Sequence, residues 1–145
     1  MDFIFLTDLF YSDYARCTQI EKKKTRPYTQ VYTEIERVQF AIPLRSEIKH
    51  SGQVLWTDKS NNCGLDFTKA IVITDNKYID TTLKPHIRQN EFDSLRGKEY
   101  IVKQKMIKHI REYKKAKEEM KTSRDRNTCA FSTMQYFEGY IKDIN

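Results

Sequence analysis

The first part of the chain carries apolar residues at the short spacing typical of β-strands. Residues 3–6 and 38–42 are apolar runs, and residues 28–35 alternate between apolar and polar side chains, so all three segments are predicted strands. A tight turn at Glu36-Arg37 joins the last two segments into a predicted hairpin, although it lacks the glycine that such turns favour. We expect further strands at residues 54–56, 65–74 and 78–80.

The later part of the chain changes to helical spacing. Between Phe92 and Tyr113 the apolar residues recur three and four positions apart, which predicts a helical region. Asn90 is the expected helix cap, and Gly97 is the expected break between two helices. Strands early and helices late, with no repeat or linker, predict one α+β domain over residues 1–145 with a mainly antiparallel, twisted sheet.

Composition and charge indicate which kinds of partner and which cell compartment the protein is suited to. An aromatic fraction of 12% argues against disorder, and a net charge of +6 favours anionic partners, such as nucleic acid or an acidic membrane surface. The chain shows neither a signal peptide nor an apolar run that could span a bilayer. The three cysteines, odd in number and far apart, indicate free thiols in a reducing compartment. We therefore expect a cytoplasmic protein without a membrane partner.

Several kinds of chemistry lack their sequence signature. No Cys/His cluster has zinc-ligand spacing, and no paired acidic motif indicates a two-metal nuclease. A glycine-rich phosphate loop and a Gly-x-Ser-x-Gly elbow are also missing. We therefore expect no metal and no cofactor.

The most informative stretch follows the apolar strand that ends near Pro43. Arg45, Ser46, Lys49 and His50 lie within six residues of one another. Guanidinium, hydroxyl, ammonium and imidazole groups at the end of a buried strand can hold phosphate chemistry on a rigid base. The alternative is an ordinary polar loop at the end of a strand.

RNA cleavage without a metal needs only the groups that this loop supplies. The RNA provides the nucleophile, its ribose 2′-hydroxyl, and the protein positions it, neutralises charge on the phosphorane and moves protons. Lys49 or His50 can move the protons, and a histidine is the better match to neutral pH. The products would be a 2′,3′-cyclic phosphate and a 5′-hydroxyl. His86 and His109 are expected to be structural or solvated.

Basic residues outside this loop suggest where RNA would lie. Residues 22–26 form a basic loop, and Tyr28 beside it offers a stacking surface for an unpaired base. Between Lys103 and Arg126 Lys and Arg outnumber Asp and Glu, which indicates a phosphate-facing side or a solvated helix face. The expected RNA-binding residues in these and neighbouring segments are Lys22, Lys23, Lys24, Tyr28, Lys59, Lys108, Arg111 and Lys115.

Four short motifs, in order over nearly the whole chain, carry a resemblance to a known family. They are Arg26-Pro27-Tyr28, Pro43-Leu44-Arg45-Ser46 with Lys49, Gly64-Leu65-Asp66-Phe67, and Thr128-Cys129-Ala130-Phe131-Ser132. Each motif alone is weak, but the ordered set resembles the toxins of type III toxin–antitoxin systems, the ToxN/AbiQ, CptN and TenpN group. TenpN is the most similar of these.

The resemblance implies a sequence-preferring endoribonuclease with a fold similar to the MazF/Kid toxins, a barrel core followed by a long basic helical region. It also implies an RNA antitoxin, a repeat-derived pseudoknot that the toxin cuts from its precursor and that then inhibits it. Cellular or phage RNA would be the substrate, a higher-order toxin–RNA assembly would form, and the role would be phage defence by abortive infection.

The family motif assigns candidate catalytic residues to the loop after Pro43. Ser46 matches the active-site serine of the family's Pro-Leu-Thr-Ser pattern, and Arg45 takes the place of its threonine. The family lysine lies two residues after that serine in ToxN, whereas here Lys49 lies three after it. Whether Lys49 or His50 corresponds to the family lysine therefore stays open.

The resemblance also assigns residues before the hairpin. Arg26 corresponds to a basic residue that matters in ToxN, and we include it among the catalytic candidates. The tyrosine of the family's N-terminal helix corresponds to Tyr11 or Tyr14, which we include among the RNA-binding candidates; packing in the core is the alternative for both. The role of Glu47, an anion beside the expected site, stays open.

Two other functions fit the residues without the resemblance. A non-catalytic RNA-binding module would use the same basic residues and Tyr28, and would leave the RNA intact. A protein-partner domain would use its basic face to bind an acidic protein, and would not bind RNA at moderate salt.

Overall fold

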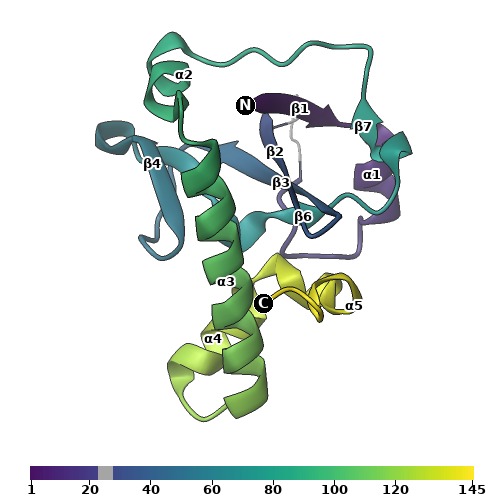
Figure 1. Cartoon of the computed structure of the whole chain (residues 1–145), viewed down its shortest axis with the longest axis vertical. Helices are drawn as coiled ribbons and strands as arrows, with labels where there is room; N and C mark the ends of the chain where they lie inside the picture. The colour runs from purple at the N-terminus through teal and green to yellow at the C-terminus, as the bar shows by residue number, and fades with distance from the viewer. Residues whose placement is uncertain (23–27) are drawn as a thin grey trace.

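Most strands come early along the chain and the longer helices come late, with one short helix directly after the first strand, as the computed structural model of the protein shows (Figure 1). It describes residues 1–22 and 28–145. The strands are β1 (Asp2–Leu6), β2 (Gln30–Ile35), β3 (Val38–Arg45), β4 (Val54–Asp58), β5 (Cys63–Asp66), β6 (Ile71–Val72) and β7 (Ile79–Asp80). The α-helices are α1 (Asp8–Asp13), α2 (Gln89–Leu95), α3 (Glu99–Glu119), α4 (Ser123–Phe131) and α5 (Glu138–Ile141). The fold class is α+β, as expected.

All the strand pairings among the described residues are antiparallel. The strand order is β4-β5-β3-β2-β1-β7, and β6 pairs with β3 beside this path. Within the described residues the sheet is open, since the pairings leave β4 and β7 as its two ends. The expected antiparallel sheet is therefore confirmed, whereas a closed barrel core is not.

The expected hairpin is confirmed as β2 and β3. Pairs run from Gln30 opposite Pro43 to Ile35 opposite Val38. Its two-residue turn consists of Glu36 and Arg37, with φ angles of 48° and 70°. Both angles lie in the left-handed region that type I′ turns require and that side chains other than Gly, Asn and Asp disfavour. Pairing of the two flanking strands therefore stabilises a turn conformation that Glu36 and Arg37 would not favour on their own.

The single strand expected over residues 65–74 is wrong. The segment contains the end of β5, a one-turn 3₁₀ helix at Phe67–Lys69, and the short strand β6. The turn starts at Asp66, whose side chain accepts a hydrogen bond from the backbone N–H of Thr68. The apolar pattern predicted a continuous strand, but this hydrogen bond from the backbone to a nearby side chain stabilises a turn in its place. This break matters because it places two polar side chains, Asp66 and Lys69, beside the sheet.

The helical region begins differently from the prediction. Helix α2 starts at Gln89 after Arg88, so Asn90 is not the cap; its side chain instead donates to Asp58 Oδ2 at 3.3 Å. The expected break at Gly97 is confirmed, with φ at 73°, and α3 follows it.

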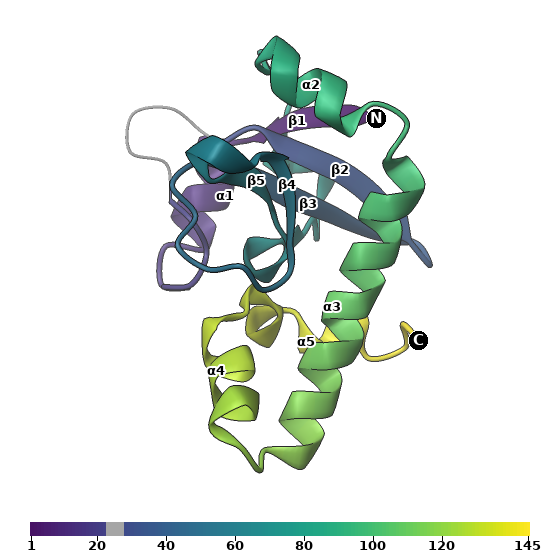
Figure 2. The ribbon, with the colours of Figure 1, turned by 90° about the vertical axis from the view of Figure 1, so that its left-hand side faces the viewer.

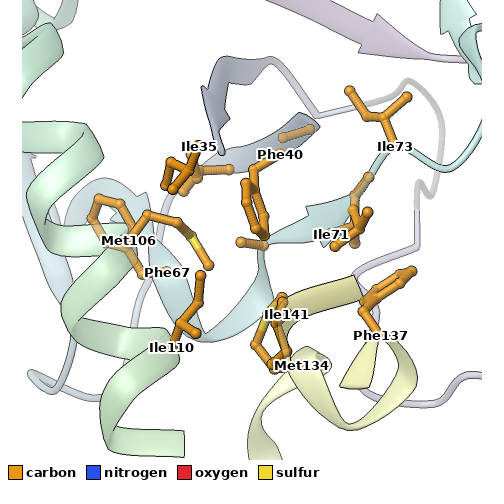
Figure 3. Packing of buried hydrophobic residues seen from close by; sticks show 14 of the residues in the cluster. Ile35, Phe40, Phe67, Ile71, Ile73, Met106, Ile110, Met134, Phe137 and Ile141 are labelled. Carbon is orange, nitrogen blue, oxygen red and sulfur yellow. The ribbon is translucent and has the colours of Figure 1, made fainter. Parts of the chain in front are cut away.

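One apolar core joins the sheet to the later helices. In Figure 3, Met106 and Ile110 of α3 face Ile35, Phe40, Phe67 and Ile71, with Met134 and Ile141 below them. Figure 2 shows α3 extending well past the sheet, with α4 returning alongside its lower half. This arrangement leaves α4 facing the loop before β4 and the turn after β5, where the candidate site lies.

Candidate active site

The centre of the site is the carboxylate of Asp66 at the end of β5, which has no exposed surface. Its Oδ2 lies 2.5 Å from Arg45 Nη1 and 2.9 Å from His50 Nε2. Its Oδ1 accepts hydrogen bonds from the backbone N–H and the hydroxyl of Thr68, at 3.1 and 2.6 Å. A buried charge needs partners of this kind, and here both oxygens are fully engaged. We call Asp66, Arg45 and His50 the Asp66 cluster.

Strand pairing explains why the cluster forms. β3 and β5 are antiparallel, with Arg45 opposite Gly64, so the guanidinium reaches the end of β5. The chain then leaves the sheet and is anchored by Ile48, which is 3% exposed and whose N–H donates to the carbonyl of Asn62 at 3.0 Å. This anchor brings His50 back over Asp66. Two distant segments therefore meet through the sheet register and one buried side chain.

The orientation of His50 follows from its partner. A carboxylate oxygen accepts, so Nε2 carries the proton in the contact with Asp66 and Nδ1 is the other ring nitrogen. The His50 side chain is 40% exposed, whereas that of Arg45 is 18% exposed and that of Asp66 fully buried. The imidazole is thus held by a buried anion on one side and open to solvent on the other, which suits transfer of a proton.

The other candidates of the loop lie differently. Ser46, Glu47 and Lys49 are exposed, and none has a side-chain hydrogen bond or ion pair with another described residue. Glu47 has φ at 54°, so the chain turns sharply directly after Ser46. The structure therefore brings Arg45 and His50 together and leaves Ser46 and Lys49 on the loop surface beside them. Glu47 holds neither Lys49 nor His50.

A pocket of about 470 Å³ opens beside the cluster. His50 lines it, so pocket and cluster are continuous. The loop before β4, the turn after β5, helix α3 and helix α4 supply the walls. The other lining residues are Gly52, Gln53, Thr68, Lys69, His109, Glu112, Arg124, Asn127, Thr128, Phe131 and Ser132.

The inner wall of the pocket holds a buried histidine. His109 is 1% exposed and its Nε2 lies 2.9 Å from Ser132 Oγ, which also accepts the N–H of Met134 at 3.1 Å. Burial lowers the pKa of His109 to about 4, although the charge of Asp66 opposes this shift. The imidazole is therefore neutral at neutral pH. Its Nδ1 is buried and has no hydrogen-bond partner among the described residues. Of the two expected alternatives for His109, its burial argues against a solvated side chain and favours a structural one.

Lys69 connects three parts of the site. Its ammonium donates to Gln19 Oε1 at 2.8 Å and to the carbonyl of Phe131 at 2.9 Å. Burial lowers the pKa of Lys69, while the charges of Asp66 and Glu21 oppose this effect. Lys69 therefore ties the segment after α1 to the end of α4.

Sequence reasoning did not assign Asp66 or Lys69 a role in the site. Asp66 belongs to one of the four family-like motifs. It is also an acidic residue beside apolar residues of a predicted strand, and this position was the sequence feature that could have marked it as a site residue. No comparable signal marked Lys69, because its partners come from segments 50 and 62 residues away.

The segment before β2 contributes to the cluster. Glu21 Oε1 lies 3.1 Å from Arg45 Nη2. Tyr28 is half-buried; burial raises the pKa of its hydroxyl, and a hydrogen bond from Arg45 opposes this effect. Tyr28 is therefore close to the cluster. Lys22 instead donates to the carbonyls of Cys17 and Ile20 at 2.7 and 3.1 Å, so its ammonium binds its own segment.

Three predicted residues of this segment, Lys23, Lys24 and Arg26, lie outside the described residues. The two tyrosines of α1 are described. Tyr11 is a core residue with 9% exposure, and Tyr14 stacks on Phe10 at 4.7 Å between ring centroids. The structure therefore favours packing over RNA binding for both.

The remaining basic candidates are exposed. Lys59 lies over the ring of Trp56, 4.3 Å from its centroid, at the far end of β4. On α3, Lys108 is 4.0 Å from Glu112, Arg111 donates to the C-terminal Asn145 carbonyl at 2.8 Å, and Lys115 points to solvent. Lys108, Arg111 and Lys115 belong to α3, the helix that forms one wall of the pocket. Lys59 is not part of the pocket lining.

No family model, curated protein or solved structure matches the chain. None of the helices in residues 1–22 and 28–145 is long and apolar enough to cross a membrane. In the same residues, no three His, Cys, Asp or Glu side chains gather in a way that could hold a metal ion. Because no comparison found a match, the resemblance to type III toxins stays a prediction.

Proposed function

We propose that the chain is a metal-independent, sequence-preferring endoribonuclease. The observation that carries this proposal is the Asp66 cluster, in which one buried carboxylate holds a guanidinium and a solvent-open imidazole side by side at the mouth of a pocket. A carboxylate-oriented histidine is suited to proton transfer, and a fixed guanidinium beside it is suited to charge on a phosphate.

The cluster can perform strand cleavage in one balanced step. His50 Nδ1 accepts the proton of the ribose 2′-hydroxyl, O2′ forms a bond to phosphorus, and the bond from phosphorus to O5′ breaks. The leaving O5′ takes a proton from a second donor, and Lys49 is the nearby ammonium. The RNA then ends in a 2′,3′-cyclic phosphate and a 5′-hydroxyl.

Arg45 and Ser46 supply hydrogen-bond donors for the phosphorane. Arg45 has five N–H groups, and its ion pairs with Asp66 and Glu21 are made by its two terminal nitrogens. Asp66 contacts both Arg45 and His50 and orients them, so it is a positioning residue and does not touch the RNA.

The wider role follows from the resemblance together with the charge of the chain. We propose a cytoplasmic type III toxin that cuts its repeat-derived RNA antitoxin from a precursor, is inhibited by it in a higher-order assembly, and acts in phage defence by abortive infection. The MazF/Kid-like barrel and the basic C-terminal helical region belong to this proposal. The net charge of +6 supports an RNA partner.

The test is RNA cleavage in EDTA by protein freed of bound RNA, with the fragment ends identified. His50→Ala should reduce the cleavage rate by about 10² to 10⁴, and Asp66→Asn should act in the same direction. His86→Ala, which changes an exposed histidine in another loop, is the matched control and should leave the rate unchanged. Folding of each variant is checked by circular dichroism.

Other outcomes separate the hypotheses. Intact RNA with a salt-dependent shift in mobility would favour the non-catalytic RNA-binding module. No shift at moderate salt would favour a protein partner. If His50→Ala abolishes cleavage but Ser46→Ala and Lys49→Ala both remain toxic in growing cells, the histidine assignment stands and the roles of Ser46 and Lys49 are refuted.

A further inference from the structure

We propose that the pocket beside the Asp66 cluster binds one unpaired purine base of the RNA, next to the phosphate that is cut. This inference rests on the proposed function and deepens it, because it assigns the residues that select the cleavage site. The occupant is a base stacked on Phe131 and read by Gln53 and Glu112.

Position is the first argument. His50 belongs both to the Asp66 cluster and to the pocket wall. A nucleotide whose phosphate contacts His50 therefore has its base within reach of the pocket. The volume of about 470 Å³ lies within the range of roughly 300 to 1,000 Å³ that is usual for small-molecule sites. It is large enough for a two-ring base.

An exposed aromatic side chain supplies the stacking surface. Phe131, the last residue of α4, is 56% exposed although it lines the pocket. Its backbone is held on both sides: Lys69 donates to its carbonyl at 2.9 Å, and the N–H of the next residue, Ser132, donates to Thr128 at 3.2 Å. A large apolar ring kept open to solvent at a pocket is the arrangement that unpaired bases stack upon.

A hydrogen-bonded pair across the pocket supplies the reading groups. Gln53 Nε2 donates to Glu112 Oε2, and the two residues are 59 positions apart in the chain. Gln53 has φ at 58°, so its place before β4 is set by an unusual backbone conformation. The pair presents an amide N–H and a carboxylate oxygen next to each other. The Watson–Crick edge of a base likewise carries donors and acceptors side by side.

The charges of the pocket favour a base over a second phosphate. Its inner wall holds the neutral His109 and the carboxylate of Glu112. The ammonium of Lys69 already donates to Gln19 and to a backbone carbonyl, which leaves the exposed Arg124 as the other lining cation. An uncharged, flat ligand with polar edges fits these walls better than an anion does.

Stacking area favours purines over pyrimidines. Base–aromatic stacking contributes about 1 to 3 kcal/mol per base, and two rings cover more of the Phe131 side chain than one. We therefore expect purine nucleotides to bind about tenfold more tightly than pyrimidine nucleotides.

The test is calorimetric titration of the full chain with the 3′-monophosphates of adenosine, guanosine, cytidine and uridine. Phe131→Ala and Glu112→Ala should each weaken purine binding by about tenfold. Glu118→Ala removes an exposed carboxylate of the same helix and is the matched control, with binding expected to be unchanged. Equal affinity for the four nucleotides, or purine binding indifferent to both substitutions, would overturn the proposal.

The outcomes for the pocket and for the enzyme are separable. If RNA is cut in a His50-dependent manner but purine nucleotides do not bind preferentially, the pocket proposal fails and the endoribonuclease proposal stands. If purines bind through Glu112 and Phe131 while RNA stays intact, the purine site stands and the endoribonuclease proposal fails. Cleavage patterns provide a further check, since Glu112→Ala should reduce the preference for purines around the cut.

Discussion

The buried histidine of α3 makes the stability of the protein depend on pH. His109 is 1% exposed, and its folded-state pKa of about 4 lies well below the ordinary value of 6.5. Between these values the unfolded chain binds a proton on this side chain that the folded protein does not bind. Lowering the pH from 6.5 to 4 therefore favours unfolding, and below pH 4 the contribution has been lost.

The size of this effect follows from the two pKa values. Each unit of difference is worth about 1.4 kcal/mol, so the depressed pKa of His109 corresponds to about 3 kcal/mol. The contribution is complete at pH 7.5, and most of it has been lost at pH 4.5, which lies just above the folded-state pKa of about 4. With a denaturant slope of roughly 1 to 3 kcal/mol per molar, the urea midpoint should fall by about 1 to 3 M from this residue alone.

The measurement is urea unfolding at pH 7.5 and pH 4.5 for the wild type and His109→Gln. Glutamine can still hydrogen-bond with Ser132 but does not titrate, so the variant should lose less stability on acidification than the wild type by about 3 kcal/mol. His86→Gln, at an exposed histidine, should behave like the wild type. If the wild type and His109→Gln lose the same stability between the two pH values, His109 is not a buried neutral imidazole and the reasoning is refuted.

Two stability predictions concern the sheet. Arg37→Gly should stabilise the protein by about 1 kcal/mol, because φ at 70° is strained for arginine and not for glycine; a lower melting temperature would contradict this account of the turn. Gly64→Ala should destabilise it by about 1 to 3 kcal/mol, because a Cβ there would lie 2.6 Å from the carbonyl oxygen of Leu55. Since Gly64 is paired with Arg45, cleavage should fall as well, and an alanine variant with unchanged thermal stability would refute the close approach.

Elements governed by local pattern were predictable from the sequence. The alternation of residues 28–35 and the apolar run after Arg37 predicted the hairpin, and Gly97 predicted the break before α3. Both features depend only on residues close together in the chain, namely the spacing of apolar side chains and the backbone freedom of glycine. The boundaries at Asp66 and Asn90 were predicted wrongly. In both places a polar side chain took another partner: the N–H of Thr68 for Asp66, and Asp58 for Asn90.

The candidate site was only half predictable. Arg45 and His50 lie within the loop that the sequence singled out, because both types of side chain are polar and follow an apolar strand directly. Asp66 and Lys69 could not be assigned, since their roles depend on which strands are neighbours. Tyr11 shows the opposite case, a residue whose type allows RNA contact but whose side chain the fold places in the core.

The sequence by itself determined the class of fold, the basic charge and the loop that carries the candidate chemistry, because these follow from period, composition and short-range order. Only the tertiary structure decided that Asp66 joins Arg45 to His50, that His109 is neutral, and that α3 and α4 enclose a pocket beside them. Each of these features depends on contacts between segments far apart in the chain. Such contacts are determined by burial and strand register, which exist only in the folded protein.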